Sequence, residues 1–141
     1  MRIMAIDYGD AHTGIAVSDP TGFLAGFTTV IEAYRPDIVA ERIALLAREH
    51  GAERLVLGHP INMDGTRGPR SEKAQAMKAL LEEATGLPVV LWDERRTTID
   101  AHQILFNSGK NAKKRKKVVD AVAASLILEG YLTYLKNHPE G

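Results

Sequence analysis

The order in which strand-like and helix-like segments follow one another is the feature that most constrains the fold of this chain. Its first three segments have strand-like composition and are separated by short turns, which predicts an antiparallel meander. Further on, segments with helical apolar spacing alternate with two short apolar strands, and this alternation implies parallel pairing through right-handed crossovers. The five expected strands span residues 2–7, 13–18, 23–31, 54–58 and 89–92. We therefore expect an α/β fold: a mixed five-stranded sheet, with a three-strand antiparallel meander plus two parallel strands, and helices on both faces.

Four helices are expected in the second part of the chain. Pro36 suits the first turn of one helix and Gly51 can end it. Ser71 is expected to cap the next helix, and Gly86 to end it. The other two are expected from position 97 or 98 to about 107, and from about 118 to 136. The basic segment between these two is expected to be a loop.

Composition places the chain among ordinary globular proteins. Its 141 residues are a one-domain length, so we expect residues 1–141 to form a single domain. The chain is 45% hydrophobic and 26% charged, and it has no apolar run near the roughly 20 residues that cross a bilayer, so no membrane span is expected. The chain contains no cysteine, which excludes disulfides, thiolate catalysis and zinc held through sulfur. A cytoplasmic location is the default expectation.

Charge is balanced overall, with 18 basic and 18 acidic residues, but one segment is strongly basic. Such a segment can bind a polyanion, although charge runs are also common on solvated loops. The segment contains Lys110, Lys113, Lys114, Arg115, Lys116 and Lys117. Arg95 is a further candidate for contact with phosphate, or else pairs with a nearby aspartate. His59, expected in a loop after the fourth strand, is either a proton shuttle or an ordinary loop histidine.

Three carboxylates stand at the edge of apolar segments on three different elements. Asp7 ends the first strand, Glu94 follows the last strand, and Asp120 interrupts the apolar start of the last helix. A charge at the edge of a core is costly unless it is paired or binds a metal. The carboxyl ends of the strands are where open α/β sheets bind ligands, so the pattern favours a divalent-metal site. Each residue also has a purely structural interpretation. Asp7 could be a turn residue, and Glu94 could pair with the neighbouring arginines. Asp120 could be a favourable charge in the first turn of a helix.

The motifs around these carboxylates resemble those of the YqgF/RuvX family of Holliday-junction resolvases and pre-rRNA nucleases. Order and spacing agree over essentially the whole chain, in Ile6–Gly9, Thr13–Asp19, Gly58–Thr66, Asp93–Arg95, Thr97, Thr98 and Asp120–Leu128. The resemblance implies a ribonuclease H-like architecture with the first strand in the centre. It also implies cleavage of phosphodiester bonds by a metal-activated water. The catalytic, metal-binding residues would be Asp7, Glu94 and Asp120, holding Mg²⁺ or Mn²⁺.

The resemblance leaves the substrate open between two nucleic acids. One is the 5′ end of the precursor to small-subunit rRNA, and the other is a four-way DNA junction. Symmetric junction cleavage needs two active sites and hence a dimer, but the sequence identifies no dimer face, so we expect a monomer or a weak homodimer. The chain also departs from the family at Ala11-His12, where a lysine or arginine is frequent, and at Arg96, where an apolar residue is usual.

Two other classes of protein remain compatible with the sequence. A non-catalytic RNA-binding factor would use the basic segment and would not need Asp7. The turn from Asp7 to Gly9, with Gly14, is also similar to the phosphate-binding hairpin of actin-like ATPases and sugar kinases. Those proteins place the nucleotide between two such domains, whereas 141 residues hold only one.

Overall fold

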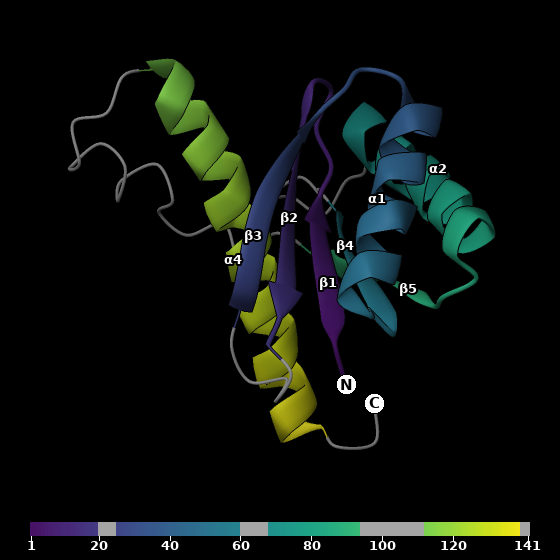
Figure 1. Ribbon diagram of the computed structural model, residues 1–141, viewed down its shortest axis with the longest axis vertical. Coiled ribbons are helices and arrows are strands. Elements are labelled where there is room, and N and C mark those ends of the chain that lie inside the picture. The colour runs from purple at the N-terminus through teal and green to yellow at the C-terminus, as the bar shows by residue number, and fades with distance from the viewer. Residues whose placement is uncertain (20–24, 60–67, 94–111, 139–141) are drawn as a thin grey trace.

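A computed structural model describes residues 1–19, 25–59, 68–93 and 112–138 of the chain, and over residues 112–120 it describes the helix without its side chains. Five strands form one sheet in the order β3-β2-β1-β4-β5 (Figure 1). They are β1 (Ile3–Asp7), β2 (His12–Ser18), β3 (Ala25–Glu32), β4 (Arg54–His59) and β5 (Val89–Asp93). Strands β1, β2 and β3 pair antiparallel, whereas β4 pairs parallel with both β1 and β5. The expected mixed sheet is confirmed, with β1 in its centre.

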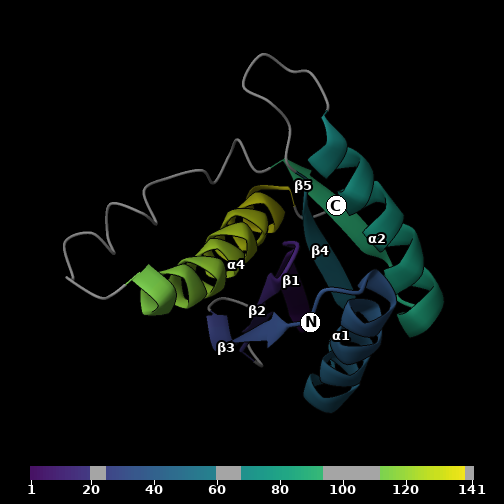
Figure 2. The same ribbon diagram turned by 90° about the horizontal axis from the view of Figure 1, so that it is seen from above.

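Helices cover both faces of the sheet, as expected. Helix α1 (Pro36–His50) connects β3 to β4, and helix α2 (Pro69–Thr85) connects β4 to β5. These two helices lie on one face, and helix α4 (Ala112–Asn137) lies on the other (Figure 2). The sheet is therefore the middle layer of three.

The ends of α1 and α2 follow local sequence signals. Proline occupies the beginning of each helix, where its missing N–H group is no loss. Gly51 and Gly86 end them at φ 65° and 70°, a left-handed conformation that glycine adopts without strain. Ser71 was expected to cap α2, but the helix begins at Pro69 and Gly68 is the capping position. Ser71 instead lies in the first turn, fully buried.

The basic segment was expected to be a loop, and this expectation is wrong for most of it. Helix α4 begins at Ala112, so the residues at positions 113–117 belong to its first two turns. Lysine and arginine are good helix formers, and adding a turn to an existing helix is much easier than nucleating one. Lys110 and the helix expected near residues 97–107 lie outside the described residues.

Alternation along the strands divides the core into two clusters, one on each face of the sheet. Met4 and Ile6 of β1 belong to the cluster beneath α1 and α2. Ile3 and Ala5 belong to the cluster beneath α4. Successive strand residues point to opposite faces, so Asp7 shares the α4 side with Ile3 and Ala5. The position of a residue in its strand therefore determines the side of the sheet on which it lies. This also holds for residues at the carboxyl edge of the sheet, called the rim below.

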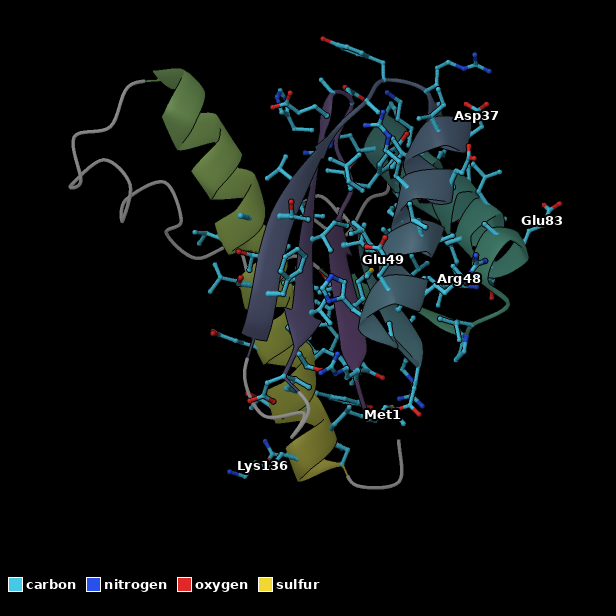
Figure 3. The ribbon with its side chains drawn as sticks, viewed as in Figure 1. Met1, Asp37, Arg48, Glu49, Glu83 and Lys136 are labelled. Carbon is cyan, nitrogen blue, oxygen red and sulfur yellow. The ribbon has the colours of Figure 1, made fainter. Side chains whose placement is uncertain are left out.

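The outer faces of the helices are polar. Asp37 of α1 and Glu83 of α2 point away from the sheet, and so does Lys136 of α4 (Figure 3). Within the described ranges, no helix is both long enough and apolar enough to cross a membrane.

Candidate functional site

Asp7 stands at the carboxyl end of the central strand. It is the last residue of β1, pairs with Gly14 across the antiparallel ladder, and is half-buried. Both neighbouring strands, β2 and β4, are hydrogen-bonded to β1 and hold its backbone in place. A carboxylate that is partly withdrawn from water needs polar or cationic partners to remain charged. Its place at the carboxyl edge of the sheet agrees with the sequence prediction.

Position 120 lies in α4, the helix that covers the side of the sheet on which Asp7 lies. Helix α4 runs antiparallel to β1, and its last turns lie near the N terminus (Figure 1). Position 120 precedes the buried residues Ala124 and Ile127 by four and seven places, which is the spacing of one helical face. The structure describes the backbone at this position and not the carboxylate.

The remaining predicted ligand lies outside the described residues. Glu94 directly follows Asp93, the last residue of β5. Among the residues that the structure describes, no group of three or more His, Asp or Glu side chains could hold a metal ion. Two of the three expected carboxylates, those of Glu94 and Asp120, are not among the described side chains. The convergence of Asp7, Glu94 and Asp120 therefore remains a prediction. The backbone positions of Asp7 in β1 and Asp120 in α4 support it.

The predicted nucleic-acid contacts are placed only in part. Arg95 and Lys110 lie outside the described residues. The other five basic residues occupy the first turns of α4, a part of the helix that extends beyond the edge strand β3 (Figure 2). These five are Lys113, Lys114, Arg115, Lys116 and Lys117. The basic turns precede position 120 on the same helix, so the helix fixes where these turns lie relative to the backbone of that predicted metal ligand.

On the opposite face of the sheet, a buried hydrogen bond attaches the start of α2 to the end of β4. His59 was expected in a loop, but it is the last residue of β4 and is only 6% exposed. Its Nε2 atom shares a hydrogen bond of 2.6 Å with the hydroxyl of Ser71, which also accepts one from Gln75 at 3.3 Å. His59 follows Leu57 by two positions, so it points toward α2 and away from the α4 side. This arrangement favours a structural role over a proton shuttle facing Asp7.

A second contact joins α2 to the turn that follows Asp7. The ammonium of Lys73 lies 2.9 Å from the Asp10 carboxylate, and both side chains are largely exposed. Tyr8 is partly buried and packs against the α1–α2 side of the core. Burial raises the pKa of the Tyr8 phenol above its ordinary value; the positive charge of Lys73 opposes this shift and the negative charge of Asp10 adds to it. Tyr8, Asp10 and Lys73 therefore form one electrostatic group at the rim.

Sequence reasoning missed both contacts that hold α2 at the rim. Lys73 and Asp10 are 63 positions apart, and His59 and Ser71 are 12 positions apart. Ser71 matched the pattern of a helix cap, which concealed its buried role. The one available signal was that Ser71 and Lys73 lie near the start of the helix that comes after β4 in the chain.

Structural comparison defines the class of fold. RuvC from Thermus thermophilus, solved in complex with a Holliday junction substrate, superimposes with a TM-score of 0.63 at 16% identity. The match covers 95% of this chain and 96% of that chain. The fold is therefore ribonuclease H-like, in the form found in RuvC-type resolvases.

Sequence comparison identifies the family. The RuvX family, described as Holliday junction resolvase, matches residues 1–134, and this chain belongs to it. A relative from Halothermothrix orenii is 43% identical over 134 residues, which is 95% of this chain and 96% of the relative. A relative from Listeria monocytogenes is 44% identical over 134 residues, or 94% and 97% of the two chains. Both are named "Putative pre-16S rRNA nuclease". The chain is a nuclease by family, as its motifs predicted.

Proposed function

We propose that this chain is a cytoplasmic, divalent-metal-dependent nuclease that processes the 5′ end of the precursor to 16S rRNA. The observation that carries the proposal is Asp7, half-buried at the carboxyl end of the central strand, on the side of the sheet that α4 covers. The names of the relatives favour precursor rRNA as the substrate. The basic turns of α4 favour a polyanionic partner.

Asp7, Glu94 and Asp120 are the residues that would hold the metal. All three offer carboxylate oxygens, the ligands that Mg²⁺ and Mn²⁺ prefer. Bound in such a set, a divalent ion activates water and stabilises the charge that develops on a phosphoryl group. Asp7 would be the central ligand of the three, because its strand lies in the centre of the sheet. The strand pairs on both sides would keep its carboxylate in place when substrate binds.

Basic residues would hold the substrate through its backbone. Lysine and arginine neutralise phosphates without reading bases, so this part of the binding would be independent of sequence and steeply dependent on salt. Arg95, next to Glu94 in the chain, would contact a phosphate close to the metal. The five basic residues of the first α4 turns would contact the strand further away.

A direct comparison of substrates tests the rRNA assignment. Labelled precursor rRNA and a synthetic four-way DNA junction are each incubated with the protein and Mg²⁺ or Mn²⁺. We expect cleavage near the 5′ end of the mature rRNA sequence and little cutting of the junction. Cleavage of the junction alone would favour the second candidate, a resolvase, and would require a dimer to supply two active sites. Binding of RNA without any cleavage would favour a non-catalytic RNA-binding factor.

Metal binding should be visible in thermal stability. Clustered carboxylates repel one another without a cation, so Asp7→Asn should raise the melting temperature of the metal-free protein. Saturating Mn²⁺ should raise that of the parent chain by roughly 5–10 °C, since a ligand at about 100 times its Kd contributes about 2.7 kcal/mol. The Asp7→Asn variant should respond much less. Equal responses of the two proteins would exclude Asp7 as a shared ligand.

A further inference from the structure

The rim beside Asp7 carries a cation that the proposed metal site does not use. Lys73 lies near the start of α2, on the face of the sheet opposite α4. Its ammonium is 2.9 Å from the Asp10 carboxylate, and the two side chains are 57% and 83% exposed. Asp10 follows Asp7 by three positions, in the turn between β1 and β2. The pair thus lies at the same carboxyl edge as the predicted catalytic carboxylate.

We propose that Lys73 binds a backbone phosphate of the nucleic-acid substrate, next to the phosphodiester positioned at Asp7, and that Asp10 holds its ammonium at the rim until substrate arrives. The inference rests on the proposed function and adds a substrate-binding residue on the face opposite the basic turns of α4. A strand crossing the carboxyl edge would then be held on both sides of Asp7.

The chemistry of the pair suits an exchange of partners. Exposed ion pairs contribute little to stability, because water and salt screen them, so Asp10 is a weak competitor. A lysine ammonium is a compact point charge that binds phosphate well. Nucleic acid presents a row of such charges, and each neutralised phosphate releases counterions, which adds to the affinity. A phosphate can therefore replace Asp10 at little cost.

The backbone that carries Lys73 is well fixed. Two residues earlier, Ser71 is buried and shares its hydrogen bond with His59 at the end of β4. Strand β4 pairs directly with β1, in parallel register from Ile3 to Ile6. Asp7 and the first turns of α2 are thus connected through adjacent strands, so the side chain of Lys73 starts from a defined place relative to Asp7. Preorganisation of this kind lowers the entropy that binding must overcome.

Binding measurements with a matched control test the proposal. Fluorescence anisotropy with two labelled single-stranded RNAs of unrelated sequence, in EDTA to prevent cleavage, gives Kd as a function of KCl concentration. Lys73→Gln should weaken binding of both RNAs about three- to tenfold and lower the slope of log Kd against log salt by about one. Lys78→Gln is the control, because Lys78 lies on the same helix and pairs with Glu82 at 3.2 Å. It should change neither quantity.

The Asp10→Asn variant distinguishes phosphate binding by Lys73 from a role in which the Lys73–Asp10 pair only fixes the turn. We expect this variant to bind both RNAs about two- to fivefold more tightly, because the competing carboxylate is gone. If it binds as weakly as Lys73→Gln, the pair only fixes the turn and the proposal is overturned. Equal affinities for Lys73→Gln and Lys78→Gln would also overturn it. Thermal melts of all variants should agree within a few degrees, which shows that the changes in affinity do not come from unfolding.

The test of Lys73 and the test of the proposed nuclease function can fail independently of each other. Cleavage that depends on Asp7, together with unchanged binding by Lys73→Gln, would refute only the role of Lys73. Weakened binding by Lys73→Gln, together with cleavage that does not require Asp7, would refute only the catalytic assignment. Absence of RNA binding by the parent chain would overturn both.

Discussion

Asp7→Asn is expected to lower the rate of cleavage about a thousandfold or more, which corresponds to roughly 4 kcal/mol of lost transition-state stabilisation. Asparagine has nearly the shape of aspartate, so the pairing of β1 with β2 and β4 should persist. The variant loses the negative charge that would hold a divalent cation. Binding of nucleic acid should be unchanged or tighter, because a charge that repels phosphate is removed. Single-turnover cleavage of labelled precursor rRNA measures the first effect and anisotropy the second.

Asp37→Asn is a suitable control for this substitution. Asp37 is an exposed aspartate in the first turn of α1, where it pairs with Arg35 at 2.9 Å. The same change of chemistry at this position should leave cleavage within about twofold, because surface ion pairs contribute little. Full activity in Asp7→Asn would contradict the catalytic assignment and would leave a role in RNA binding as the better interpretation.

Gly9→Ala is expected to reduce both stability and cleavage. Gly9 lies in the turn after Asp7, where an added Cβ would overlap the backbone carbonyl oxygen of His12. A backbone atom at the start of β2 cannot move aside without displacing the strand, so the turn must shift instead. Overpacking of this kind typically costs about 1–3 kcal/mol. Because Asp7 is two positions away, we expect cleavage by the folded variant to fall more than about tenfold, since small displacements of catalytic groups are costly.

Gly51→Ala provides the matched comparison. Gly51 ends α1 at φ 65°, and an added Cβ would meet no atom within 4 Å. Alanine there should cost about 1 kcal/mol through backbone strain alone. Urea denaturation measures the two losses of stability, and cleavage under conditions where both variants are folded measures the effect on the site. Similar activities in the two variants would mean that the turn at Gly9 does not position Asp7.

Most of the fold could be predicted from the sequence because its signals are local. Strand composition and turn residues predicted the meander, and helical spacing predicted α1 and α2, with the proline start of α1 and the glycine ends of both. The errors also have local causes. Ser71 matched a cap pattern, while its burial depends on a partner in β4. The basic residues after Ala112 were assigned to a loop because the last helix was expected to begin with the apolar residues near position 118, although their helix propensity is high.

The candidate site was predictable to a lesser extent. Asp7 could be placed because a carboxylate that ends an apolar strand is visible in the sequence, and the structure has it at the carboxyl end of β1. Asp120 could be assigned to a helix, and its backbone lies in α4. The proximity of these carboxylates to each other and to Glu94 is a long-range property, and it remains a prediction from the family resemblance.

The amino-acid sequence alone determined the order and type of the described elements, the family, and the residues at which to look for catalysis. Each of these depends on neighbours along the chain, through periodicity, capping and motif spacing. Only the tertiary structure decided that Asp7 lies on the α4 side while His59 and Tyr8 lie on the other, and that Lys73 meets Asp10 across 63 positions. Contacts of this kind arise from how α2 packs on the sheet, and packing geometry is set by the whole core rather than by any local segment.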